Sequence, residues 1–150
     1  MEITSPIFKE GDIIPSQYTC DGPDISPPLV WDDVPKSAKG FVLICDDPDA
    51  PMGIWVHWVL YHLPADVKKL PENVPPDEEL ENGAMQGKND FGRIGYGGPC
   101  PPSGTHRYYF KLYALDEELS FEPGMEKDQL LEAIDGHVLD EATLMGRYQR

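Results

Sequence analysis

Two stretches of the chain are apolar at nearly every position, which is typical of strands that are buried on both faces. Residues 40–45 read Gly-Phe-Val-Leu-Ile-Cys, and residues 55–63 form a longer run that Pro64 ends. Continuous apolar runs of this length, bounded by turn residues, favour central strands of a layered sheet. We therefore predict central strands at 40–45 and 55–63.

Residues 106–115 alternate instead, as expected of a strand with one face in the core. Its even positions form an apolar face that begins with a histidine: His106, Tyr108, Phe110, Leu112 and Ala114. Its odd positions are wetter, because they include Arg107 and Lys111. Successive side chains of a strand point to opposite faces, so this pattern predicts a half-buried strand. Shorter strands are expected at 2–8 and 29–31, and a weaker one within 82–90.

The same period of two predicts where the histidines of the 55–63 strand point. Trp55, His57, Val59 and Tyr61 are expected on one face, and Trp58, Leu60 and His62 on the other. We therefore expect His57 and His62 to point to opposite sides and not to share a site.

Helical signals are confined to the last part of the chain. Residues 126–134 carry Leu130, Leu131 and Ile134 at helical spacing, and Gly136 is a suitable stop. Residues 138–148 are ambiguous, since Glu141-Ala142 favours a continued helix whereas alternating apolar and small residues favour a strand; we prefer the strand. The whole pattern predicts a mainly β protein, an antiparallel β-sandwich of two sheets with one or two short helices near the C-terminus.

Composition supports this architecture and limits the partners. The chain has 14 glycines and 16 prolines in 150 residues, which indicates many turns, and no linker or repeat divides it, so we expect a single domain over 1–150. The formal net charge is −15, which disfavours nucleic acids and anionic bilayers as partners. We find no segment of transmembrane length and no signal-like N-terminus, and we expect a cytoplasmic protein.

The three cysteines favour reduced thiols. Cys20, Cys45 and Cys100 form no Cys-x-x-Cys motif, and an odd number argues against a closed disulfide framework. A bridge between Cys20 and Cys100 is one of three pairings, and nothing else in the sequence supports it.

Candidate chemistry lies at two junctions between loops and strands. Asp47 ends a buried strand, His57 follows ten residues later, and the glycine- and proline-rich loop 95–105 leads into His106. If these strands are neighbours, one carboxylate and two imidazoles meet at one cleft. Imidazole N–H groups, and backbone amides near Gly97 and Gly98, are donors suited to phosphate or carboxylate oxygens.

Ordinary structural roles compete with this interpretation. A histidine on an apolar strand is more often a hydrogen-bonded core residue than a ligand-binding one. Asp47 and Asp49 adjoin prolines and are good turn residues without any other role. His62 is best explained as structural and His137 as a surface or cap residue.

Catalytic motifs are absent, so we predict no enzyme, no cofactor and no metal. The chain has neither a Gly-x-Ser-x-Gly elbow nor a complete dinucleotide fingerprint. A metal site of Asp47, His57 and His106 is chemically feasible, but no local ligand spacing supports it. Cys100 as a nucleophile with His106 as its base has no geometric support either.

Residues 47–51 (Asp-Pro-Asp-Ala-Pro), 57–58 (His-Trp) and 97–108 together resemble the two signature regions of the phosphatidylethanolamine-binding proteins, also called the Raf kinase inhibitor protein family. Residues 18–22 and 136–148 are similar to its short bacterial and archaeal branch, and the resemblance covers essentially the whole chain. It implies a β-sandwich, a pocket for phosphate, phosphorylethanolamine or carboxylates, and a homodimer. By position, the implied ligand-binding residues are Asp47, His57, Gly98, His106 and Tyr108.

The sequence therefore leads to a non-enzymatic binding protein for a small anionic ligand, with modulation of a protein partner as a further role. The alternative is a kinase or protease inhibitor, or a scaffold, that acts through its surface while the pocket is vestigial. A weak hydrolase or metal enzyme is the third and least favoured hypothesis.

Overall fold

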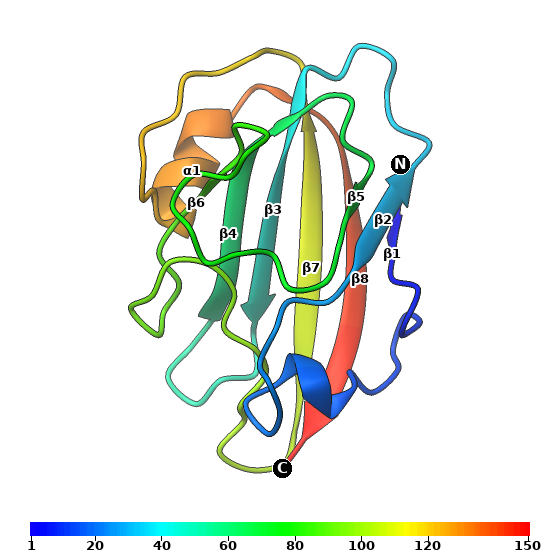
Figure 1. The fold of residues 1–150 in the computed structure, drawn as a ribbon, viewed down its shortest axis with the longest axis vertical. Coiled ribbons are helices and arrows are strands. Elements are labelled where there is room, and N and C mark those ends of the chain that lie inside the picture. The colour runs from blue at the N-terminus through cyan, green and yellow to red at the C-terminus, as the bar shows by residue number, and fades with distance from the viewer.

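The computed structural model describes residues 1–150 as two antiparallel sheets with one α-helix (Figure 1). The five-stranded sheet has the order β6-β4-β3-β7-β8, and the three-stranded sheet has the order β1-β2-β5. The elements are β1 (Glu2–Thr4), η1 (Ser16–Tyr18), β2 (Leu29–Asp32), β3 (Gly40–Asp47), β4 (Trp55–Pro64), β5 (Lys69–Leu70), β6 (Met85–Gln86), β7 (Thr105–Leu115), α1 (Lys127–Ile134) and β8 (Val138–Gln149). The predicted two-sheet β fold with a short helix near the C-terminus is confirmed.

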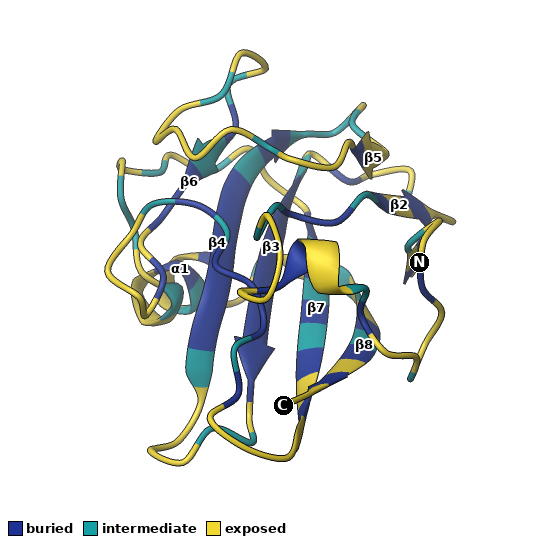
Figure 2. Cartoon of the chain, turned by 60° about the horizontal axis from the view of Figure 1, so that its bottom comes forward, coloured by how far each residue is buried: buried dark blue, intermediate teal, exposed yellow.

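The large sheet is covered on both faces, which explains the continuous apolar runs of β3 and β4. Its inner face packs against the small sheet and includes Phe41, Leu43, Trp58 and Phe110. Its outer face contributes a smaller cluster of Val42, Ile44, Val59 and Tyr61, which α1 covers with Leu130 and Ile134. Both predicted central strands are therefore confirmed, and Figure 2 shows them buried along most of their length.

The types of the remaining predicted elements are confirmed, and their bounds differ most at the first strand. The alternation of β7 and the strand assignment of β8 are confirmed, and α1 begins at Lys127 with Glu126 as its N-cap. The first strand is shorter than predicted, because β1 ends at Thr4 instead of continuing to residue 8. Ser5 directs its hydroxyl to the carbonyl of Pro28, and Pro6 has no amide hydrogen for a ladder bond.

Strand β4 contains two irregularities that a strict period of two cannot predict. Cys45 pairs with Trp58 and Asp46 pairs with Val56, so His57 is an extra residue without a partner in β3. The prediction that His57 shares a face with Val59 and Tyr61 is therefore wrong. The bulge turns its ring to the inner side, where its centroid lies 5.1 Å from that of Tyr108.

The second irregularity lies near His62, which has a φ of 56°. Its Nδ1 lies 3.2 Å from the carbonyl oxygen of Gly83, and its ring packs against Phe121. These contacts agree with the predicted structural role of His62. Its neighbours differ from those of His57, so the two histidines do not form one site.

A disulfide between Cys20 and Cys100 joins two irregular segments that lie 80 residues apart in sequence. The two Cα atoms are 5.4 Å apart, and the amide of Cys20 also donates to the carbonyl of Pro99. The prediction of reduced thiols is wrong for this pair, and only Cys45 is free. The cytoplasmic location inferred from reduced cysteines loses that support. No helix of the structure has the length and apolar character needed to cross a membrane.

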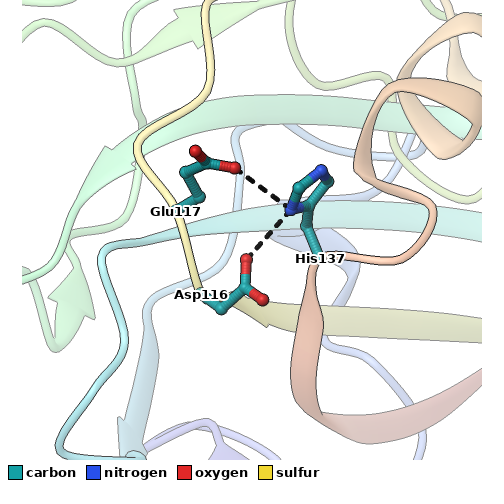
Figure 3. Close-up of side chains that lie close together, drawn as sticks. All are labelled: Asp116, Glu117 and His137. Atoms are coloured by element: carbon teal, nitrogen blue, oxygen red, sulfur yellow. Dashed lines mark hydrogen bonds and ion pairs between the residues drawn. The ribbon is translucent and has the colours of Figure 1, made fainter.

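His137 connects the segment after β7 to the start of β8 (Figure 3). Its Nδ1 lies 3.0 Å from Asp116 Oδ1 and 3.4 Å from Glu117 Oε2, and the amide of Asp116 donates to the carbonyl of His137. The group is partly exposed, which agrees with the surface role predicted for His137.

Removing the disulfide is expected to lower the free energy of unfolding by about 2–5 kcal/mol, because the closed loop is long and its loss enlarges the unfolded ensemble. The Cys20→Ser/Cys100→Ser double variant and the wild type are compared by urea denaturation without reductant. Wild type measured with excess reductant serves as the control and should approach the double variant. Equal midpoints for all three samples would contradict the expectation.

Candidate functional site

A pocket of about 210 Å³ opens at the end of the large sheet where β3 ends and β4 and β7 begin. This end of the sheet is at the bottom of the molecule in Figure 1 and comes forward in Figure 2. Four of the five predicted site residues line the pocket: Asp47, His57, His106 and Tyr108. The rest of the wall is largely apolar and consists of Ala50, Pro51, Met52, Trp55, Phe91, Cys100, Pro101 and Pro102.

Asp47 and His106 form a buried pair in the wall of this pocket. Asp47 is the last residue of β3, and His106 is the second residue of the neighbouring strand β7. His106 Nδ1 donates to Asp47 Oδ2 at 2.7 Å, since a carboxylate can only accept, and Asp47 Oδ1 accepts the amide of Asp49 at 2.7 Å. The carboxylate therefore orients the imidazole, whose Nε2 has no protein partner and is not sealed from solvent.

His57 is held in a similar way by a backbone carbonyl. Its Nδ1 donates to the carbonyl oxygen of Gly97 at 2.6 Å, and its ring lies edge-on to Tyr108 and Phe91. Burial lowers the pKa of His57 below its usual value, although the Gly97 carbonyl and Asp47 act in the opposite direction. At neutral pH the ring is therefore uncharged, and its Nε2 carries a lone pair and accepts hydrogen bonds.

Tyr108 supplies a hydroxyl group that no protein atom satisfies. The side chain is buried, and its hydroxyl is the one buried side-chain polar atom in the chain without a hydrogen-bond partner. Desolvation, with a further contribution from Asp47, raises the pKa of Tyr108 well above its ordinary value, so the hydroxyl keeps its proton. An unpaired buried hydroxyl costs about 1–3 kcal/mol, and this one is sealed from solvent, so only the ring of Tyr108 forms part of the pocket wall.

Gly98 does not line the pocket. Its amide donates to Asp24 Oδ1 at 2.8 Å, and the amide of Gly97 donates to the carbonyl of His57. The expectation of free amides at these two glycines is therefore wrong. A Cβ at Gly98 would lie 2.3 Å from the carbonyl oxygen of Tyr18, so the glycine allows the two loops to pack closely.

A bidentate ion pair holds the loop that follows Asp47. Arg107 Nε and Nη2 donate to the two carboxylate oxygens of Asp49 at 2.9 and 2.8 Å, and the amide of Arg107 also donates to Oδ2. These interactions lower the pKa of Asp49 to about 2. Asp49 thus does more than turn the chain, because it fastens the loop to β7 beside His106.

Sequence reasoning missed the apolar part of the wall and two supporting contacts, one made by the Asp24 carboxylate and one by the Gly97 carbonyl. Pro101 and Pro102 belong to the predicted loop 95–105, and no local signal shows that a loop residue will face a cavity. Asp24 and the carbonyl of Gly97 support the site through contacts 74 and 40 residues apart in sequence. A spatial arrangement of this kind is not encoded in residue spacing.

The pocket residues do not form a compact set of metal ligands. The group of one histidine and two carboxylates whose ligand atoms lie within 4.8 Å of one another is Asp116, Glu117 and His137, at the other end of β7. The proposed pairing of a Cys100 nucleophile with His106 also fails in this structure, because the sulfur of Cys100 is bonded to Cys20.

Comparison with known proteins gives full-length matches. The family profile described as phosphatidylethanolamine-binding protein matches residues 4–149. A UPF0098 protein of Methanothermobacter thermautotrophicus is 56% identical over 150 residues, covering 100% of this chain and 99% of that protein. A UPF0098 protein of Aquifex aeolicus is 50% identical, over 100% of this chain and 89% of its own length.

Two solved structures share the fold closely. A phosphatidylethanolamine-binding protein homologue from Chlamydia trachomatis superposes with a TM-score of 0.92 at 48% identity, covering 99% of this chain and 97% of its own. YbcL of E. coli, described as a member of the mammalian PEBP family, gives a TM-score of 0.91 at 32% identity, over 99% and 98% of the two chains.

His57 makes part of the protein's stability dependent on pH. Because the folded-state pKa is lowered, the unfolded chain binds a proton more readily, so stability is lost as the pH falls below about 6.5 toward the folded-state pKa. We expect His57→Gln to lose less unfolding free energy than the wild type between pH 7.5 and 5.5. Urea denaturation at both pH values measures this, and the other three histidines, common to both proteins, act as the internal control. An equal loss in both proteins would contradict the expectation.

Proposed function

Since this chain belongs to the phosphatidylethanolamine-binding protein family, we propose that it binds a small phosphate- or carboxylate-bearing ligand in the pocket and performs no chemistry on it. The observation that carries the proposal is the Asp47–His106 pair, which directs one imidazole nitrogen of a buried ring into the pocket. The ligand contacts we propose are Asp47, His57, His106 and Tyr108. Gly98 contributes through the packing of its loop and not through its amide.

The polar atoms of the pocket suit an anion whose binding is coupled to the uptake of a proton. Neutral His57 offers a lone pair, and a neutral His106 whose Nδ1–H is bonded to Asp47 offers another. An anion oxygen needs donors, so binding requires proton uptake by an imidazole or a protonated form of the ligand. Asp47 stabilises a charged His106 ring at short range, and the ring of Tyr108 adds to the wall around it.

This local arrangement allows the pocket to bind an anion although the protein carries a large net negative charge. A net charge of −15 repels anions at a distance, but the attraction of an imidazolium at hydrogen-bond distance is much less screened than that of exposed charges. The apolar wall strengthens the interaction by excluding water. We therefore expect selective binding at short range and no long-range steering of the ligand.

The side chains around the two imidazoles favour binding without chemistry. The wall contains no serine or threonine hydroxyl, and its only cysteine is bonded to Cys20. His106 thus has no activated nucleophile beside it of the kind that acyl-transfer chemistry requires.

The first test is calorimetric titration with phosphorylethanolamine, and separately with acetate, from pH 5.5 to 8. Affinity is expected to fall as the pH rises, with net proton uptake detected in buffers of different ionisation enthalpy. His57→Ala and His106→Ala should each weaken binding about tenfold or more, the loss typical of a charge-assisted hydrogen bond. His137→Ala, far from the pocket, is the matched control. Affinity that is independent of pH and of the two pocket histidines would refute the proposal.

Asp47→Asn separates proton-coupled binding from simple charge attraction. Removing a negative charge beside the pocket would by itself strengthen anion binding. We expect the opposite, a loss of about tenfold at pH 6 with a weaker dependence on pH, because the asparagine no longer stabilises the charged imidazole. The same titration measures this, with Asp116→Asn as the control. Tighter binding by Asp47→Asn would contradict the proton-coupled arrangement.

A protein partner is a second candidate, favoured by the exposed apolar side chains beside the pocket mouth. Met52 is 95% exposed and Ile54 is 57% exposed, both in the loop between β3 and β4. Exposed apolar groups of this kind mark protein interaction sites, and a kinase or protease bound there would leave the pocket vestigial. A partner captured equally by wild type and by His57→Ala/His106→Ala, but lost in Met52→Asp/Ile54→Asp, would favour this second function.

A further inference from the structure

The Cys20–Cys100 disulfide lies beside the pocket and is open to solvent on one side. Cys20 is exposed, whereas Cys100 is half-buried and forms part of the pocket wall. A thiol approaching from solvent therefore reaches the sulfur of Cys20 more easily than that of Cys100. Thiol–disulfide exchange needs access to one sulfur and a stable leaving thiolate on the other.

Arg150 provides a positive charge for that leaving thiolate. Its Nη1 lies 3.2 Å from Cys100 Sγ and 3.6 Å from Cys20 Sγ. The residue is held in place, because its backbone exchanges two hydrogen bonds with Gly104 and its Nε lies 3.4 Å from Asp21 Oδ1. A guanidinium beside a cysteine stabilises the thiolate form, and here it lies nearer to Cys100.

The disulfide is also a main restraint on one part of the pocket wall. On the N-terminal side, the amides of Gly97 and Gly98 are bonded to His57 and Asp24, and the carbonyl of Pro99 accepts from Cys20. On the C-terminal side, Gly104 pairs with Arg150. Residues 100–103 make no backbone hydrogen bond, although Pro101 and Pro102 line the pocket.

We propose that the Cys20–Cys100 disulfide is a thiol-exchange site that controls the pocket. A dithiol reductant attacks Cys20, Cys100 leaves as a thiolate beside Arg150, and the released segment 100–103 lowers the affinity of the pocket for anions. The last step rests on the proposed anion binding, whereas the exchange and the release of the segment do not.

The exchange proceeds by two successive thiolate attacks. A thiolate of the reductant attacks Cys20 Sγ, the S–S bond breaks, and its electron pair stays on Cys100 Sγ. The second thiolate of the reductant then attacks its own sulfur in the mixed disulfide, which frees Cys20 as a thiolate that takes up a proton. The protein gains two electrons and the dithiol becomes a disulfide.

Reduction of the disulfide lowers the affinity of the pocket for anions in two ways. Residues 100–103 lose their covalent link to Cys20, so Pro101 and Pro102 no longer form a preorganised wall, and ordering them again opposes binding. The Cys100 thiolate also places a negative charge in the wall of a pocket that accepts anions. Both effects weaken binding of the same ligand.

The chemistry is tested first, without any pocket ligand. The oxidised protein is mixed with glutathione, quenched with acid, and the modified cysteine is identified by mass spectrometry. Glutathione is expected on Cys20. Reduction by dithiothreitol at pH 7 is expected to be about threefold slower in Arg150→Gln, because the leaving thiolate loses its counter-charge. Arg147→Gln, whose guanidinium contacts Gly11 and not the sulfurs, is the control.

Glutathione on Cys100, or equal reduction rates for Arg150→Gln and the control, would overturn the exchange mechanism. The release of the segment is measured separately by amide order parameters from NMR relaxation. The order parameters of the Cys100 and Ser103 amides are expected to fall below about 0.6 on reduction, and those of the Gly97 and Gly98 amides are expected to stay unchanged. Unchanged order at Cys100 and Ser103 would overturn the release.

Coupling to the pocket is measured by titrating oxidised and reduced protein with phosphorylethanolamine at pH 6. The reduced form is expected to bind about tenfold more weakly. Cys20→Ser/Cys100→Ser separates release of the wall from thiolate charge, and it should lie between the two forms. Equal affinities of the oxidised and reduced forms would overturn the coupling alone. If the oxidised protein binds no anion, the proposed function and the coupling both fail, while the two earlier measurements still decide the exchange and the release.

Discussion

The hydrogen bond between His106 Nδ1 and Asp47 Oδ2 is the interaction on which the rest of the site depends. It joins the last residue of β3 to the beginning of β7, and it is made between two buried side chains. Without it, the Asp47 carboxylate would lack the cation-capable partner that a buried acid needs, and the imidazole could rotate out of the pocket. The Asp49–Arg107 ion pair and the carbonyl of Gly97 then position the surrounding loops around this bond.

The fold could be predicted to a large extent from the sequence, because burial leaves a direct mark on it. β3 is apolar from Phe41 to Cys45 because both its faces are covered there, and β7 alternates because only one of its faces is deeply buried. Asp47, His57 and His106 could be identified as one group because a proline or a glycine-rich loop marks each strand end. The pattern of residues could not show which atoms would be free, so the amide of Gly98 was assigned to a ligand although Asp24 binds it.

The other errors share a physical origin, since each concerns contacts between segments that are distant in sequence. The Cys20–Cys100 bond depends on two irregular segments meeting, and irregular segments have no period from which their course can be inferred. The orientation of His57 depends on its pairing with β3, which contains one residue fewer at that point. Burial, by contrast, is encoded locally, which is why it was predicted more reliably than contact.

The bulge at His57 has a consequence for how this protein can vary. The extra residue separates the pocket end of β4 from the core residues that follow. The alternation of side chains between the two faces in one part of the strand therefore does not fix the alternation in the other part. Residues before the bulge can change length or direction without turning Trp58 and Leu60 away from the inner core. Changes of length or sequence ahead of the bulge can therefore reshape the rim of the cavity while the packing of the sandwich is left intact.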